Sequence, residues 1–140
     1  MMEPRVSIIT IVVEDLDLMA GFYRSMGFKR HRIDDGVAFF QSGGAIFALF
    51  PRETAEMDSG IAFGEGPSRV YLAYNTRTEF EVDAVLALAE RAGGKIVKQA
   101  SRAFWGGWYG YFTDPEGNVW EVAHNPDFPL DEAGNISLPE

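Results

Sequence analysis

The sequence GGWYGYFTDPEGNVWEVAHNP, residues 106–126, decides the fold. Two runs rich in aromatic and β-branched residues, Trp108–Thr113 and Asn118–His124, flank the turn sequence Asp114-Pro115-Glu116-Gly117. This pattern predicts a β-hairpin. Glu121 lies inside the second run with apolar neighbours on both sides. A carboxylate is rarely placed on an apolar strand unless it is paired or faces a cavity. The side chain of Glu121 is therefore expected either to have a partner or to face a cavity.

The composition is that of a soluble globular protein. The chain has 140 residues, which fits one domain or two small fused halves. Hydrophobic residues make up 46% and charged residues 24%, enough apolar material for a sizeable core. The formal net charge of −9 argues against nucleic acid and anionic membrane surfaces as partners, because both are bound through Lys and Arg.

The absence of cysteine excludes disulfides, thiolate nucleophiles and cysteine-type zinc sites. The apolar run that precedes Glu14 and Asp15 is too short for a signal peptide or a membrane span. A cytoplasmic location is therefore expected.

The first half of the chain reads as strand, helix and three strands. Val6–Val13 is rich in β-branched residues and predicts a buried strand. Asp15 is a candidate N-cap for a helix over Leu16–Met26, and Gly27 is a suitable stop. The following strands, separated by the turn clusters 34–36 and 42–44, are predicted at Phe28–Ile33, Val37–Gln41 and Ala45–Phe50.

The second half repeats this order. A strand over Arg69–Asn75 precedes a helix over Glu79–Ala92, with Thr78 and Glu81 at the spacing of a capping box. The remaining strands are Lys95–Lys98 and the two runs of the hairpin. The sequence thus predicts a first βαβββ module over residues 1–50, a connecting loop over 51–68, a second module over 69–126 and a polar C-terminal tail over 127–140.

The sequences ITIVVEDLDLMAGFYRSMGF (residues 9–28) and TDPEGNVWEVAHNP (residues 113–126) resemble the vicinal oxygen chelate superfamily. This superfamily includes glyoxalase I, bleomycin-resistance proteins, fosfomycin-resistance proteins and extradiol dioxygenases. The resemblance covers about residues 5–126. It implies an α+β fold in which two βαβββ modules, each a half-open barrel of mixed sheet, form a cleft around the active site.

Metal-dependent members of the superfamily hold one divalent ion with His, Glu or Gln from the first and last strands of the modules. The resemblance places the last-strand glutamate at Glu121. The two first-strand positions fall on Ile8 and Tyr71, and the fourth falls within Ala48–Phe50, where the sequence has no acid or histidine. Neither His31 nor His124 lies where it would complete such a site. No functional metal and no cofactor are therefore expected, and any metal that did bind would use Glu121.

Aromatic side chains gather before and within the hairpin. Trp105 and Trp108 flank Gly106-Gly107, where the backbone can bend, and Tyr109 and Tyr111 share one face of their strand. Ligand sites are commonly aromatic, but core or interface packing explains such a cluster equally well. The predicted ligand-binding residues are Ile8, Phe47, Leu49, Tyr71, Trp105, Trp108, Tyr109 and Tyr111.

Glu121 is the candidate catalytic residue, as a hydrogen-bond acceptor or general base. The alternative is a structural acid paired with an Arg, Lys or Tyr side chain inside the barrel. Lys98 and Arg102 could pair with Glu121, attract an anionic ligand or be exposed rim charges. The favoured hypothesis is a homodimeric glyoxalase/bleomycin-resistance-like protein that binds a small molecule in an aromatic cleft without a functional metal. The rivals are a metal-dependent lyase, isomerase or dioxygenase with atypical ligands, and a non-catalytic structural or regulatory dimer. Whether the protein is an enzyme stays open, because one fold hosts many chemistries.

Overall fold

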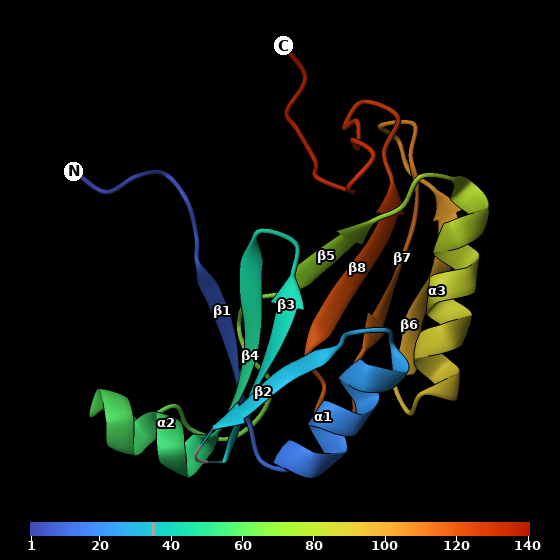
Figure 1. Cartoon of the computed structure of the whole chain (residues 1–140). Coiled ribbons are helices and arrows are strands. Elements are labelled where there is room, and N and C mark those ends of the chain that lie inside the picture. Colours follow the sequence, from blue (N-terminus) through green and yellow to red (C-terminus); the bar gives the residue numbers. More distant parts are fainter. Residues whose placement is uncertain (35) are drawn as a thin grey trace. The chain divides into compact units, whose positions relative to one another are not determined.

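The computed structural model describes residues 1–34 and 36–140, and of residues 30–34 it describes the backbone alone. The side chain of His31 and the centre of the predicted turn over 34–36 therefore lie outside the described residues. The chain divides into two compact units, Met1–Glu65 and Gly66–Glu140. Each unit is built around its own mixed sheet (Figure 1).

The first unit contains one four-stranded sheet in the order β1-β4-β3-β2. The strand β1 runs parallel to β4, and the other neighbours are antiparallel. Its elements are β1 (Ile8–Val13), α1 (Leu16–Ser25), β2 (Arg30–Asp34), β3 (Val37–Ser42), β4 (Ala45–Pro51) and α2 (Arg52–Ser59).

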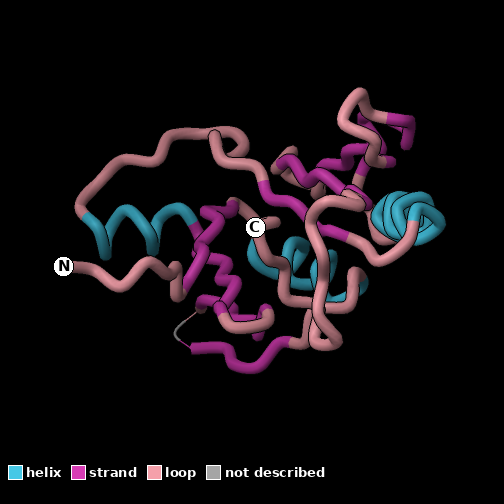
Figure 2. The backbone as a smooth tube through the Cα atoms, turned by 90° about the horizontal axis from the view of Figure 1, so that it is seen from above, coloured by secondary structure: helices cyan, strands magenta, loops and turns pink. Residues whose placement is uncertain are grey.

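The second unit repeats this arrangement with the sheet order β5-β8-β7-β6, and β5 runs parallel to β8. Its elements are β5 (Leu72–Asn75), α3 (Glu79–Arg91), β6 (Lys95–Arg102), β7 (Trp108–Thr113) and β8 (Val119–His124). The predicted α+β class and the two βαβββ modules are confirmed. Figure 2 views α3 end-on, beside the strands of this unit.

The two predicted N-caps start the helices that follow them. The Asp15 carboxylate accepts a hydrogen bond from the backbone N–H of Leu18 at 3.0 Å. The Thr78 hydroxyl accepts one from the N–H of Glu81 at 3.2 Å. Each cap satisfies an N–H that the first helical turn leaves without a partner. Gly27 follows the end of α1 with a φ of 112°, a conformation that suits glycine.

A buried cluster joins α3 to one face of the second sheet. Val82, Leu86 and Ala89 of α3 are buried, as are Phe112 and Val122 of the sheet. Gly110 sits under this helix, where a β-carbon would lie 2.7 Å from Cδ1 of Leu86 and 2.7 Å from the carbonyl oxygen of Lys98. Helix and strand can approach this closely because residue 110 has no side chain.

The predicted hairpin turn is fixed by a buried carboxylate. Oδ1 of Asp114 accepts hydrogen bonds from the backbone N–H groups of Glu116 and Asn118, and the Asn118 amide donates to Oδ2 at 2.9 Å. Asp114 and Asn118 are each only 2% exposed. Gly117 closes the turn with a φ of 88°. The DPEGN sequence therefore sets the register of β7 against β8.

The prediction of a loop throughout 51–68 is wrong, because α2 occupies its first part. The helix buries a single residue, Ala55, so its sequence shows little apolar periodicity. A tertiary contact supports its first turn: the Arg52 guanidinium contacts both carboxylate oxygens of Glu14, at 2.5 and 3.1 Å. Sequence periodicity could not reveal this pairing.

The C-terminal tail repeats the hairpin turn in miniature. Asp131 accepts hydrogen bonds from the N–H groups of Ala133 and Asn135, as Asp114 does in the DPEGN turn. Leu130 and Ile136 form an isolated antiparallel bridge across it. Among the described residues, no helix is both long and apolar enough to cross a membrane.

Candidate functional site

The second sheet has one face that packs against α3 and an opposite face, which we call the open face. Glu121 on β8 lies across from Tyr111 on β7 and beside Ala73 on β5. The buried residues Trp120 and Val122 alternate with Glu121 and point to the helix side. Glu121 therefore lies on the open face.

A phenol holds the carboxylate. The hydroxyl of Tyr111 donates a hydrogen bond to Oε2 of Glu121 at 3.0 Å, and both side chains are half-buried. Burial raises the pKa of Tyr111, and its hydrogen bonds with Glu121 and Tyr71 raise that pKa further. Tyr111 thus keeps its proton at neutral pH and acts as a fixed donor. In the part of the chain that the structure describes, it is the one donor to Glu121.

Four aromatic rings line up beside this hydrogen bond, and we call them the aromatic row. The ring of Tyr71 meets Tyr111 edge-on at 6.0 Å between centroids, and Tyr111 meets Tyr109 edge-on at 6.0 Å. Trp105 follows at 5.7 Å from Tyr109. These separations are those of favourable aromatic pairs. Four of the predicted ligand-binding residues are therefore brought together on one surface.

Gly107 makes room for the end of the aromatic row. A β-carbon at residue 107 would lie 1.7 Å from Cζ3 of Trp105 and 2.7 Å from the carbonyl oxygen of His124. Gly106 has a φ of 92°, which allows the tight loop between β6 and β7. The predicted bend at Gly106-Gly107 is present, and its effect is to seat the Trp105 indole against its own backbone.

Lys98 joins the open face from β6. Its Cα lies across from that of Tyr111. Its ammonium is 4.3 Å from the centroid of the Tyr109 ring and donates to the Tyr109 hydroxyl oxygen at 2.5 Å. Arg102 instead forms an ion pair with Glu79. Among the described contacts, Glu121 therefore forms no ion pair with Lys98 or Arg102.

Trp108, which the sequence assigns to the site, does not lie on the open face. Its indole N–H donates to Oδ2 of Asp83 on α3 at 3.1 Å, and the guanidinium of Arg102 lies 5.3 Å from the ring. Trp108 is one residue away from Tyr109, so strand alternation sends its side chain to the helix side. It attaches β7 to α3.

Two of the first-unit residues assigned to the site, Phe47 and Leu49, are buried in the core. Phe47 is 3% exposed and Leu49 is 0% exposed. The Phe47 ring packs on Tyr23 of α1 at 4.9 Å, so this side of β4 is core. Ile8 is 49% exposed and pairs in register with Ile46. Phe47 and Leu49 therefore have almost no surface to offer a ligand.

The donor set around Glu121 does not fit a metal ion. Its described neighbours on the sheet are a phenol and the methyl group of Ala73. Divalent ions in proteins are usually held by several carboxylate or imidazole ligands. Among the described residues, no three His, Cys, Asp or Glu side chains converge on one point.

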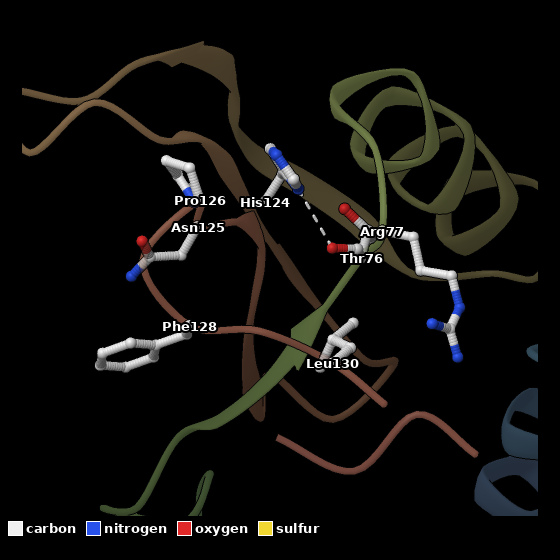
Figure 3. A pocket seen from close by; sticks show the side chains of 7 residues that line it. All are labelled: Thr76, Arg77, His124, Asn125, Pro126, Phe128 and Leu130. Atoms are coloured by element: carbon white, nitrogen blue, oxygen red, sulfur yellow. Dashed lines mark hydrogen bonds between the residues drawn. The ribbon is translucent and has the colours of Figure 1, made fainter. Parts of the chain in front are cut away.

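A small pocket lies elsewhere in the second unit, at the ends of β5 and β8 (Figure 3). Nδ1 of His124 is 3.2 Å from the carbonyl oxygen of Thr76, while the guanidinium of Arg77 points away from the other labelled groups. Sequence reasoning missed this pocket, because the C-terminal tail builds part of it. It is lined by Thr76, Arg77, His124, Asn125, Pro126, Phe128 and Leu130.

The repeated βαβββ units and the carboxylate on the last strand define the class of protein. The family model "Glyoxalase/Bleomycin resistance protein/Dioxygenase superfamily" matches residues 5–122. The chain therefore belongs to this superfamily, as the resemblance predicted. No curated protein shows significant similarity to it.

Solved structures agree with this assignment. A glyoxalase-related enzyme from Fulvimarina pelagi is 30% identical, with a TM-score of 0.92, over 99% of this chain and 100% of that one. A superfamily enzyme from Burkholderia phytofirmans PsJN is 21% identical, with a TM-score of 0.76, over 84% of this chain and 96% of that one. A lactoylglutathione lyase from Agrobacterium tumefaciens is 23% identical, with a TM-score of 0.69, over 87% and 94%. The last two similarities show the fold alone.

Proposed function

We propose that this protein binds a small organic molecule on the open face of the second sheet, without a functional metal. The aromatic row provides the apolar surface, and Glu121 provides a hydrogen-bond acceptor. The observation that carries the proposal is the Tyr111–Glu121 hydrogen bond beside the row of rings. A binding surface of this kind combines apolar contact area with a few oriented polar groups.

The position of Glu121 suits an acceptor role. Tyr111 donates to Oε2, which leaves Oε1 for a ligand N–H or O–H. The same carboxylate would serve as a general base if the ligand carries an acidic proton within reach. Binding alone needs no such step, so we propose binding as the function and proton transfer as its extension.

A metal-dependent lyase, isomerase or dioxygenase is the second candidate. The observation that favours it is Glu121 itself, a carboxylate at the last-strand position where the superfamily places a metal ligand. The donor set near Glu121 speaks against it, because the residue's described side-chain partner is a phenol. Metal analysis of protein purified without chelator separates the two. Stoichiometric metal that is lost in Glu121→Gln would replace the first proposal by the second.

We also propose a homodimer. The outer strands β1 and β5 of the two sheets carry or adjoin exposed apolar residues, among them Ile8, Tyr71 and Tyr74. Exposed edge strands with apolar side chains favour pairing with another chain. Light scattering at several concentrations tests this proposal, and a monomer at all of them would overturn it.

Tryptophan fluorescence tests the binding proposal directly, because Trp105 is the tryptophan in the aromatic row. A screen of small aromatic and heteroaromatic compounds should find ligands that quench the emission and raise the unfolding temperature. Trp105→Phe should remove most of the quenching, whereas the matched variant Trp108→Phe should retain it. Ligands that quench both variants equally, or the absence of any ligand, would refute the open face as the binding surface.

A further inference from the structure

The charged side chains of the open face have opposite signs on its two sides. Glu121 on β8 offers a carboxylate, and Lys98 on β6 offers an ammonium. Lys95 adds a second cation on the same face, because it pairs in register with Thr113, which shares the side of Tyr111. The face therefore has an acidic strand and a basic strand, with the aromatic strand β7 between them.

The separation of the backbone positions that carry the two charges follows from the register. Lys98 lies across from Tyr111 on β7, and Tyr111 lies across from Glu121 on β8. Neighbouring strands are about 4.8 Å apart, so the Cα atoms of Lys98 and Glu121 are about 10 Å apart. Each charge binds a phenol rather than the other charge.

The hydroxyl groups of Tyr109 and Tyr111 have opposite hydrogen-bonding roles, which adds to the difference between the acidic and the basic side of the face. Tyr111 donates its proton to Glu121, so the acidic side presents an acceptor. Tyr109 accepts a hydrogen bond from Lys98, so its own proton stays available and the basic side presents donors. A ligand that lies along the row would therefore meet donors at one end and an acceptor at the other.

From this polarity we infer that the ligand carries two opposite charges on an aromatic or apolar body. Its amine or other cationic N–H group faces Glu121, and its carboxylate or other anionic group faces Lys98 and Tyr109. The inference rests on the proposed function, since it names the ligand class for the same surface. Neutral ligands would form no ionic contact with either charge, and ligands with one charge would form it on only one side.

The test uses one rigid aromatic body in four charge states. The probes are 4-(2-aminoethyl)benzoate, its methyl ester, its N-acetyl derivative and the doubly blocked N-acetyl methyl ester. Isothermal calorimetry with the full chain should rank the zwitterion first. Blocking either charged end should weaken binding about five- to tenfold, the range for a charge-assisted hydrogen bond at a partly exposed site.

Two variants assign each end of the ligand. Glu121→Gln should abolish the preference for the free amine and keep the preference for the free carboxylate, and Lys98→Met should do the reverse. Glu90→Gln, on the outer surface of α3, and Lys29→Met are the matched charge controls and should change neither preference. Thermal unfolding of each variant confirms that it is folded.

The outcomes separate this inference from the proposed function. Equal affinity for all four probes, with quenching still lost in Trp105→Phe, would overturn the two-charge inference and leave the binding surface in place. Charge preferences that survive both Glu121→Gln and Lys98→Met would also overturn it, because recognition would then lie elsewhere. Binding of none of the probes, together with no hit in the fluorescence screen, would refute both proposals.

Discussion

Replacing Tyr111 by phenylalanine removes the hydroxyl that holds Glu121 and leaves the ring of the aromatic row. A hydrogen bond to a charged group contributes about 1.5–3 kcal/mol when it is well shielded from water. Both side chains are only half-buried, so water replaces part of the lost interaction. We therefore expect Tyr111→Phe to lower the free energy of unfolding by about 1 kcal/mol at pH 7.

The pH dependence adds a second signature. The pKa of Tyr111 is raised in the folded state, chiefly by burial, with Glu121 adding to the effect. The stabilisation is therefore complete below the unfolded tyrosine pKa of about 10, and it falls as the pH rises from there toward the folded pKa. The slope of that fall is at most about 1.4 kcal/mol per pH unit for one group. Tyr111→Phe should show a correspondingly shallower loss of stability above pH 10.

Urea unfolding at pH 7, 9, 10 and 10.5 measures both effects. Tyr109→Phe is the matched control, because its hydroxyl contacts Lys98 rather than a carboxylate. The reasoning is refuted if Tyr111→Phe loses no stability at pH 7. An alkaline slope in Tyr111→Phe as steep as that of the unmodified protein would contradict it as well.

Three further changes test the structure around the site. Gly107→Ala should cost about 1–3 kcal/mol and shift the emission of the displaced Trp105, seen by denaturation and fluorescence, because its β-carbon overlaps that indole. Trp108→Phe should cost about 1 kcal/mol without weakening ligand binding, since it removes the hydrogen bond to Asp83 on the helix side and leaves an aromatic ring there. Thr78→Ala should lower the stability by about 1 kcal/mol through loss of the α3 cap, measured by circular dichroism during denaturation.

Local chemistry made the strands and caps of this protein readable from its sequence. The DPEGN turn, the caps at Asp15 and Thr78 and the β-branched first strand each depend on residues within a few positions of one another. The first turn of α2 is supported by Glu14, which lies 38 residues before its partner Arg52. A sequence pattern that is read over a few neighbouring residues therefore cannot predict this contact. The five-residue turn over 131–135 was readable in principle, since DEAGN copies the pattern of DPEGN.

Alternation along a strand says which residues share a face, but it does not say which face is the core. In the second unit the charge of Glu121 indicates the face opposite α3, and Tyr109 and Tyr111 lie on that face by strand alternation. The assignment of Tyr71 rests on the resemblance to the superfamily instead. Trp108 was assigned against its own alternation, on proximity to a bend.

In the first unit, β4 carries no charged residue that would indicate which of its faces is buried, but Thr10 on the neighbouring strand β1 does indicate it. Thr10 is exposed and lies in register with Ala48, so the even-numbered residues of β4 share its side. Phe47 and Leu49 must then face α1, which is where the structure has them. A polar residue on a neighbouring parallel strand thus decides the orientation of an apolar strand that carries no polar residue of its own.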